Sequence, residues 1–415
     1  MTVLSLGSHS PGSRPLGLHR TVLLLASTHF LVDGYGNIYA PLLPLLIPRL
    51  RLSLAGAGLI AMCFQMAGSV SQLGFGHLAD RWRPRVLLMA GPVVSVTLLS
   101  LVGLSTSAWM LATVLVAGGF GGAAFHPPAA ALAHRLSGVR KGFAMSVYIT
   151  GGSLGFALGP VVFAPIVQRL GLGWTPIFIL PGLLALALTM RHMPQVESLQ
   201  ERHDARGFAG LRPYAKPLTL LYLIVVLRTL TALSFSTFMP VMLTRRGMSV
   251  GHAGLIAAVY LFAASIGGFF GGPLADRWGA RRVIIASLLS AAPLLALAPL
   301  LSGWMFVAIL AVGGFLLQST LPVNVMFGQT IAPISAATVS SLMMGFAWGT
   351  GGLMVPFVGV LADRVGIEHA LVTVAVMPLM ASALALPLPD RIRPGTVPRM
   401  PAVHQPETTG ADVAE

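Results

Sequence analysis

The sequence predicts an all-α, polytopic membrane protein with twelve transmembrane helices arranged as two six-helix bundles. Only 9% of its 415 residues are charged and 55% are hydrophobic, whereas a soluble domain carries about 25% charged residues. Apolar runs of about 20 residues, the length that crosses a bilayer, recur along the chain. Basic residues concentrate in alternate loops between these runs, as in inserted membrane proteins. These observations argue against a soluble catalytic domain.

Each apolar run defines one expected helix, and the runs fall into two sets of six. The first set covers 21–47, 54–78, 85–105, 108–133, 142–168 and 172–190, and the second covers 217–243, 250–275, 282–301, 304–331, 337–361 and 368–388. The polar stretch 191–216 is expected to link the bundles 21–190 and 217–388 in the cytoplasm. Residues 1–20 are expected to form a cytoplasmic tail without a cleaved signal, and the Pro-rich residues 389–415 a disordered cytoplasmic tail.

The distribution of Lys and Arg predicts the orientation. With a cytoplasmic N-terminus, 19 of the 26 basic residues lie in inside segments and 6 in outside segments, and the remaining one is Arg228. This excess predicts that both termini lie on the cytoplasmic side of the membrane. The membrane is expected to be a bacterial inner membrane. The net charge of +14 is spread over these loops, so a nucleic-acid partner is not expected. The lone Cys63 cannot form an intrachain disulfide.

Internal repeats support the arrangement in two bundles. The pattern Gly-x-Leu-Ala-Asp-Arg-Trp occurs at 76–82 and again at 272–278, an offset of 196 residues (276 − 80). Shorter copies end the fifth predicted helix at 166–169 and the eleventh at 359–364. Within each half, the two copies are 88 residues (168 − 80) and 87 residues (363 − 276) apart, which is the length of one three-helix unit. This spacing predicts two inverted three-helix repeats in each bundle. In transporters built from such repeats, one half rocks against the other.

Few ionisable side chains lie inside the predicted helices, and these are the candidate functional residues. A charge near mid-membrane costs on the order of 2.5–3.5 kcal/mol on insertion scales, so it is retained for function or by pairing. Asp33 is the only carboxylate well inside a predicted helix, with His29 and Asn37 one turn away on either side. This polar stripe is expected to face a cavity and to handle protons or substrate. The alternative is a structural ion pair.

Two basic side chains complete the candidate set. Arg228 falls, by the repeat offset, at the depth of Val32 beside Asp33. It could neutralise Asp33 in one conformation, or bind an anionic substrate through paired hydrogen bonds. His126 precedes two prolines, which favour a kinked or open helix. Its imidazole could carry protons, although a hydrogen bond to a carbonyl freed at the kink is the simpler explanation.

The repeated loop resembles the signature loop of the major facilitator superfamily, Gly-x-Leu-Ala-Asp-Arg-x-Gly-x-Arg-Arg. The copy that begins at Gly272 matches fully, whereas the first copy has Arg83 where the second glycine is expected. The resemblance implies gating contacts at the cytoplasmic mouth, while the alternative is that these loops only set topology. The gating contacts would involve Gly76, Asp80, Arg81, Gly272, Asp276, Arg277 and Arg281.

A narrower resemblance is to the fosmidomycin-resistance group of drug exporters in this superfamily. It rests on His-Phe-x-x-Asp-Gly at 29–34, Phe-His-Pro at 125–127, Arg228, Phe-Gly-Gln at 327–329, and glycine runs at 151–160 and 345–352. The resemblance implies proton-driven export of small toxic compounds, and it adds Gln329 to the expected cavity. Pro128 and Thr330 stand where the group usually has glutamate.

The two glycine runs are expected to pack helices, because small residues four apart let helices approach closely. The fifth and eleventh predicted helices occupy equivalent places in the repeats, so these runs are expected to form a sliding contact between the halves. The residues concerned are Gly151, Gly155, Gly159, Pro160, Gly345 and Gly349.

The expected function is secondary active transport without an enzymatic reaction, namely proton-coupled efflux of a small organic compound or drug by alternating access. The compound is expected to be anionic if Arg228 binds it. No Walker-type loop or metal-ligand spacing is present, so neither ATP, a metal nor another cofactor is expected. A metabolite importer or facilitator, and a transport-dead sensor or assembly protein, remain as alternatives. The expected partners are lipid, protons and one small-molecule substrate, for a protein that works as a monomer.

Overall fold

The computed structural model describes residues 20–81, 84–136, 141–193, 207–332, 339 and 341–389. In this part of the chain, eleven helical segments are long and apolar enough to cross a membrane. The shorter apolar helix Leu54–Ser69 stands at the second expected position. The predicted all-helical, polytopic fold is therefore confirmed. Residues 1–19 and 390–415 of the two predicted tails, and residues 194–206 of the predicted linker, lie outside the described residues.

The N-terminal bundle contains interrupted as well as continuous spans. Its helices are α1 (Arg20–Gly36), α2 (Leu43–Leu50), α3 (Leu54–Ser69), α4 (Ser71–Arg81), α5 (Pro84–Leu99), α6 (Ala108–Arg135), α7 (Lys141–Leu170) and α8 (Ile179–Met190), with 3-10 turns η2 (Ala40–Leu42), η3 (Val102–Leu104) and η4 (Leu172–Phe178). The first expected span divides into α1, η2 and α2. Pro41 lies at the start of η2, where its missing N–H is tolerated best.

The C-terminal bundle follows the same plan. Its helices are α9 (Ala215–Arg245), α10 (Val250–Trp278), α11 (Ala280–Leu297), α12 (Gly303–Ile331), α14 (Ala347–Leu353), α15 (Val355–Val365), α16 (Ile367–Val374) and α17 (Met377–Leu384), with 3-10 turns η5 (Gly207–Tyr214) and η6 (Ala298–Leu300) and the π-helix η8 (Ser341–Phe346). The end of the predicted linker is thus helical, because η5 leads directly into α9.

The predicted repeat is also visible in the backbone. The glycine three residues after the acid or amide of a copy has φ near +90° in three copies, namely Gly171 (89°), Gly279 (90°) and Gly366 (90°). This conformation is open essentially only to glycine, and it ends α7, α10 and α15 at equivalent places. The fourth copy carries Arg83 there, which lies outside the described residues.

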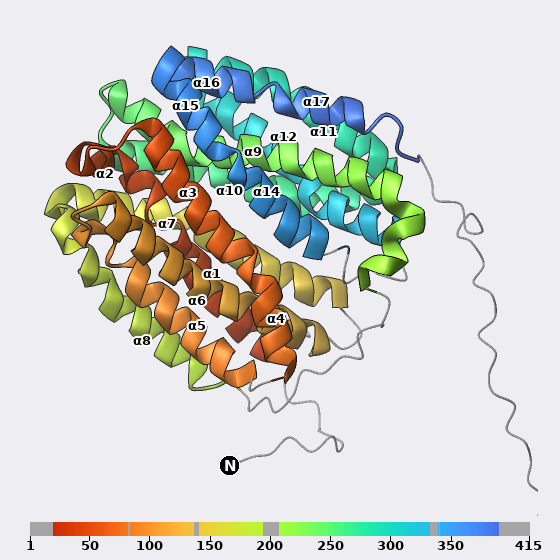
Figure 1. Cartoon of the computed structure of the whole chain (residues 1–415), viewed down its shortest axis with the longest axis horizontal. Helices are drawn as coiled ribbons and strands as arrows, with labels where there is room; N and C mark the ends of the chain where they lie inside the picture. The colour runs from red at the N-terminus through yellow and green to blue at the C-terminus, as the bar shows by residue number, and fades with distance from the viewer. Residues whose placement is uncertain are drawn as a thin grey trace, which may run out of the picture.

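The two bundles lie side by side, with the red to yellow-green helices α1–α8 forming one and the green to blue helices α9–α17 the other (Figure 1). Within the N-terminal bundle, α1 packs along α7. Across the boundary, α7 packs against α10 and α3 packs against α15. These four helices form the contact between the bundles on which the site depends.

The glycine run of α7 does not face the other bundle, which corrects the expected sliding contact. A Cβ at Gly151, Gly155 or Gly159 would collide with backbone atoms of α1, so these glycines let α1 and α7 touch within one bundle. The face of α7 that meets α10 instead includes Pro160, whose carbonyl oxygen lies 3.2 Å from a Cβ built at Gly254. By contrast, the atoms nearest to Gly345 and Gly349 belong to the N-terminal bundle.

Candidate functional site

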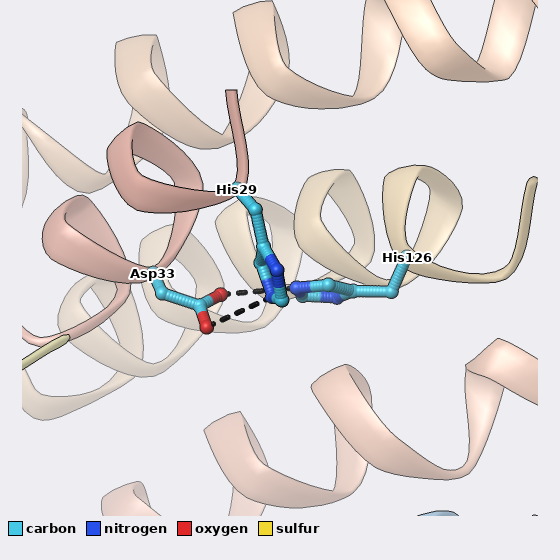
Figure 2. Close-up of side chains that lie close together, drawn as sticks. All are labelled: His29, Asp33 and His126. Carbon is cyan, nitrogen blue, oxygen red and sulfur yellow. Dashed lines mark hydrogen bonds and ion pairs between the residues drawn. The ribbon is translucent and has the colours of Figure 1, made fainter. Parts of the chain in front are cut away.

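Three ionisable side chains meet inside the membrane-spanning part of the N-terminal bundle. Oδ2 of Asp33 lies 3.1 Å from Nε2 of His29, and Oδ1 lies 3.0 Å from Nε2 of His126 (Figure 2). His29 and Asp33 share one face of α1 because they are one turn apart, and His126 comes from α6. The Asp33 side chain is 25% exposed. One carboxylate therefore bridges two imidazoles, and we call this group the His-Asp-His cluster.

The position of His126 differs from the expected one. Helix α6 runs through Pro127 and Pro128 without an interruption, so the expected opening of the helix is not found. His126 contacts Asp33 rather than a freed carbonyl oxygen, and its Nδ1 atom is buried without a partner in the described part of the chain.

A backbone carbonyl group of α7 determines which ring nitrogen of His29 carries a hydrogen. Nδ1 of His29 lies 2.9 Å from the carbonyl oxygen of Tyr148, and the two rings stack with centroids 4.4 Å apart. A carbonyl oxygen only accepts, so Nδ1 carries a hydrogen. The contact between Nε2 and Asp33 then needs a further proton, on the imidazole or on the carboxyl group. Without that proton, two lone pairs would face each other at 3.1 Å.

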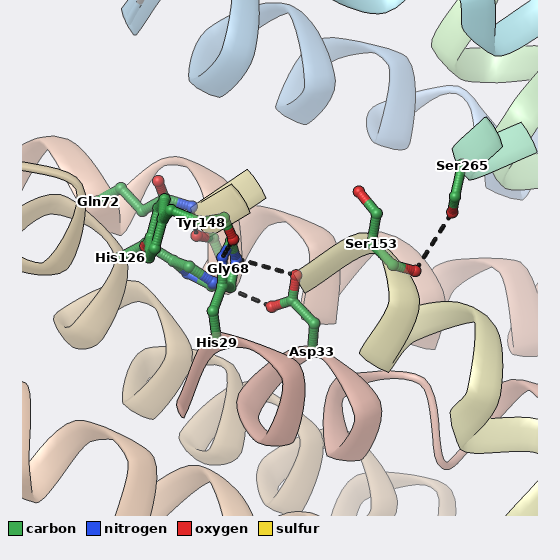
Figure 3. Close-up of polar contacts among 8 residues, drawn as sticks. All are labelled: His29, Asp33, Gly68, Gln72, His126, Tyr148, Ser153 and Ser265. Carbon is green, nitrogen blue, oxygen red and sulfur yellow. Dashed lines mark hydrogen bonds and ion pairs between the residues drawn. The ribbon is translucent and has the colours of Figure 1, made fainter. Parts of the chain in front are cut away.

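The cluster lies next to the boundary between the bundles. Oγ of Ser265 on α10 donates to the carbonyl oxygen of Ser153 on α7, at 3.3 Å. Ser153 follows Gly152, and a Cβ at Gly152 would lie 2.6 Å from Oδ2 of Asp33. Figure 3 shows this serine pair beside Asp33, with the histidines on the other side. A movement of α10 against α7 can therefore reach the surroundings of Asp33.

Gly152 makes room for the His29–Asp33 contact, and Gly152→Ala is expected to destabilise the protein by about 1–3 kcal/mol through overpacking. Thermal unfolding of the purified protein measures the effect. Adding His29→Ala should recover most of the loss, because removing the imidazole frees the space. Gly68→Ala is the control, since a Cβ there meets nothing within 4 Å. Equal destabilisation by the two glycine substitutions would contradict the prediction.

Arg228 is buried in the C-terminal bundle with no exposed surface. Its Nη1 donates to Oε1 of Gln318, its Nη2 donates to Thr229 Oγ1 at 3.1 Å, and its Cζ lies 5.4 Å from the ring centroid of Trp348. Its Nε atom has no partner among the described residues. Nor does any carboxylate within that set lie within 4.0 Å of it. In the described part of the chain, the positive charge is therefore held by neutral groups.

The hypothesis that Arg228 neutralises Asp33 is not met in this conformation, because Asp33 is paired with the two histidines. Asn37 also leaves the expected polar stripe. Helix α1 ends at Gly36, and Nδ2 of Asn37 donates to the carbonyl oxygen of Phe156 at 2.8 Å. Asn37 thus ties α1 to α7 and does not join the cluster.

Helix α12 contributes a residue that the sequence did not single out. Gln329 is half-buried near the end of α12, eleven residues or about 16 Å beyond Gln318 along the axis. It is Gln318 that contacts Arg228. An amide inside an expected span was a usable signal for Gln318, as was the lone tryptophan Trp348 in the second glycine run. The hydrogen bond at Tyr148 uses its backbone oxygen, which has no sequence signal.

The predicted gating residues are resolved in one copy of the signature loop. In the first copy, the side chains of Asp80 and Arg81 lie outside the description. In the second copy, Asp276 and Arg277 are exposed, and neither forms an ion pair with another described residue. Arg281 donates to the carbonyl oxygen of Leu386, which joins the start of α11 to the chain after α17. A gating role for these loops stays a prediction.

At the opposite end of the bundles, the shorter repeat copies cap helices across the boundary. The carboxylate of Asp363 on α15 accepts hydrogen bonds from the backbone N–H of Leu54 at 2.9 Å and of Ala55 at 2.8 Å. Ser53 caps the next N–H group, that of Gly56. The first turn of α3 is thereby satisfied partly by the other bundle. A carboxylate also interacts favourably with the positive end of a helix.

The equivalent copy on α7 makes the same kind of contact in the reverse direction. Oε1 of Gln168 accepts a hydrogen bond from the backbone N–H of Gly251 in the first turn of α10. We call these two contacts the cross-bundle caps. They hold the bundles together at the end where α3 and α10 begin, which the distribution of loop charges predicts to be the outer end.

Asp363→Asn is expected to weaken one cross-bundle cap by about 1–2 kcal/mol, because the amide has no charge and one acceptor fewer. The share of molecules opened at that end should rise by roughly tenfold. The separation of α3 and α15 is measured by double electron–electron resonance. Spin labels are attached at Leu59→Cys and Phe357→Cys in a Cys63→Ser background. Glu368→Gln is the control, since Glu368 pairs with Arg246 of its own bundle. An unchanged distance distribution in Asp363→Asn would contradict the prediction.

Comparisons with known proteins agree with this architecture. The profile of the Major Facilitator Superfamily matches residues 25–249 and 221–409. The fosmidomycin resistance protein of Escherichia coli K12 is 30% identical over 375 residues, which is 88% of this chain and 92% of that protein. The MFS-type transporter YfnC of Bacillus subtilis 168 is 28% identical over 391 residues, covering 90% and 94% of the two chains.

The solved structures give the same result for the fold. A bacterial homolog of the human lysosomal transporter Spinster, in an inward-facing and unoccupied conformation, superposes with a TM-score of 0.72 at 20% identity. The superposition covers 90% of this chain and 97% of the homolog. The fold class, the narrower resemblance and the absence of an enzymatic role are thus confirmed. The chain is a multi-pass membrane protein, and it belongs to the Major Facilitator Superfamily of transporters.

Proposed function

We propose that this protein is a proton-coupled exporter of a small organic anion, working as a monomer by alternating access. It would reside in a bacterial inner membrane with both termini in the cytoplasm. The observation that carries the proposal is the contact between His29 and Asp33, which requires a removable proton inside the membrane-spanning part. The name of the Escherichia coli relative, a fosmidomycin resistance protein, supports a role in export of a toxic compound.

The proton and the helix arrangement are coupled through the cluster. With the proton present, His29 and Asp33 are held together and His29 stays bonded to Tyr148 of α7. Loss of the proton leaves two facing lone pairs, so Nε2 and Oδ2 must separate or attract another cation. Because α7 packs against α10 of the other bundle, this rearrangement favours one relative position of the bundles over the other.

The uncompensated charge of Arg228 supports an anionic substrate. A buried guanidinium group without a carboxylate is unfavourable, and an anion that enters the site offsets this cost. The planar fork of donors fits a carboxylate or a phosphonate. The neighbouring ring of Trp348 offers an apolar surface to the rest of the compound. In this arrangement, the N-terminal bundle handles protons and the C-terminal bundle handles the anion.

The test uses inverted membrane vesicles that respiration has acidified inside. Fosmidomycin and a panel of phosphonates and carboxylates are added while the internal pH is followed. We expect a rise of internal pH that depends on the compound and on the protein, because each exported anion is exchanged for protons. Vesicles without the protein give the background. Uptake of a labelled compound without proton movement would contradict the proposal and favour a facilitator, and proton movement in the opposite sense would favour an importer.

A further inference from the structure

We propose that the His-Asp-His cluster also binds a divalent transition-metal ion of the Zn²⁺ type, in competition with its proton. The candidate ligand atoms of His29, Asp33 and His126 all lie within 4.8 Å of one another. The sequence predicts no metal site because His126 lies 93 positions after Asp33, far from the other two residues along the chain. Only the packing of α1 against α6 brings the three ligands together.

The donor set and the distances suit such an ion. Two imidazole nitrogens and one carboxylate oxygen form a three-ligand set that leaves a position open. With bonds of about 2.0–2.1 Å and angles between octahedral and tetrahedral, neighbouring donor atoms are about 2.9–3.4 Å apart. Nε2 of His29 lies 3.1 Å from Oδ2 of Asp33, and Nε2 of His126 lies 3.0 Å from Oδ1. Both separations fall within this range, although each involves a different oxygen of the carboxylate. Because one ligand atom from each residue lies within 4.8 Å of the other two, side-chain rotation can close the three ligands around an ion.

The surroundings of His29 are those of a metal-binding imidazole. Its Nδ1 donates to the carbonyl oxygen of Tyr148, which fixes the tautomer and directs the Nε2 lone pair at the cluster, as outer partners of ligating histidines do. The same lone pair faces a carboxylate oxygen, so a cation between them removes the repulsion. Among the described residues, His126 has no such partner at Nδ1. A missing outer partner typically weakens binding by 10- to 100-fold, so affinity should be moderate.

Binding can be measured without any transport substrate. The purified full-length protein in nanodiscs, with its affinity tag removed, is titrated with Zn²⁺ by calorimetry and with Co²⁺ by visible absorption. We expect one ion per chain, with affinity that falls at least tenfold in His29→Gln and in His126→Gln. Affinity should also fall as pH is lowered, because the ligands must be deprotonated to bind. His369→Gln, at an exposed histidine whose Nδ1 lies 3.0 Å from the carbonyl oxygen of Val365, should bind as wild type does.

Size-exclusion profiles identify any variant that fails to fold, and His126→Gln keeps the volume and polarity of the half-buried imidazole. Absence of stoichiometric binding by folded wild type would overturn the proposal, as would equal binding by wild type and His126→Gln. Metal binding does not rest on the proposed function. If the ion binds to the cluster but leaves anion-driven proton movement intact, the metal site stands and the proton path must lie elsewhere.

Discussion

Asp33→Asn is expected to lower gradient-driven transport at least tenfold, while passive exchange of the anion across the membrane stays unchanged. Asparagine keeps the shape of the carboxylate but has neither its charge nor its proton. Its Nδ2 can donate directly to Nε2 of His29, so the contact with His29 persists without the extra proton that the wild-type pair requires. The bundles can then change position without taking up or releasing a proton, and coupling is lost.

Proteoliposomes separate the two activities. Accumulation of labelled compound under an imposed pH gradient measures coupling, and exchange at equal pH measures movement of the carrier. The matched control is Glu368→Gln, which also neutralises one acid but acts on the exposed pair with Arg246. Full gradient-driven accumulation by Asp33→Asn would exclude Asp33 from the proton path. Loss of both activities together would show that Asp33 is needed for the conformational change itself.

Arg228→Gln is expected to reduce anion affinity about 100-fold or more, since removing one partner of a buried charge pair typically costs 2–5 kcal/mol. Thermal stability without substrate should not fall. The wild-type guanidinium group is fully buried and contacts Gln318, Thr229 and Trp348, and no carboxylate in the described part of the chain lies within 4.0 Å of it. Replacing it with a neutral amide removes that unfavourable burial. Loss of binding combined with preserved or improved stability is the distinguishing result.

Two further variants sharpen this test. Arg228→Lys keeps the charge but loses the planar fork, so it should bind the anion about tenfold less tightly and discriminate poorly between carboxylates and other anions. Arg245→Gln, an exposed position at the end of the same helix, should bind as wild type does. A marked drop in thermal stability for Arg228→Gln, with affinity unchanged, would assign Arg228 a structural role.

The fold was predictable because each membrane span can be recognised from its own stretch of sequence. An apolar run between charged loops needs no tertiary information, and the repeated loop showed how the spans are grouped. The exact divisions were less accessible. The break of the first span at η2 and the short helices α14 and α15 depend on prolines and packing inside runs that stay apolar throughout. A hydropathy pattern does not register such interruptions.

The site was predictable only where its residues are neighbours in sequence. His29 and Asp33 follow from spacing on one helix, whereas the contact with His126 depends on how α6 packs on α1. The expected pairing of Asp33 with Arg228 assumed that equal depth in the two bundles means contact. Instead, each residue contacts side chains of its own bundle. Asp33 pairs with the two histidines, and Arg228 contacts side chains on α12 and α14. The space that Gly152 provides likewise depends on the approach of α7.

The two cross-bundle caps differ in charge, and this difference predicts which of the two contacts between the bundles opens first. The cap at Asp363 carries a full negative charge, so dissolved ions screen part of its attraction for the helix end. The cap at Gln168 is neutral and lies beside the close approach of Gly254 to Pro160. High ionic strength should therefore loosen the α3–α15 edge first. The bundles would then rotate about a hinge at the α7–α10 contact, rather than separate equally at both contacts.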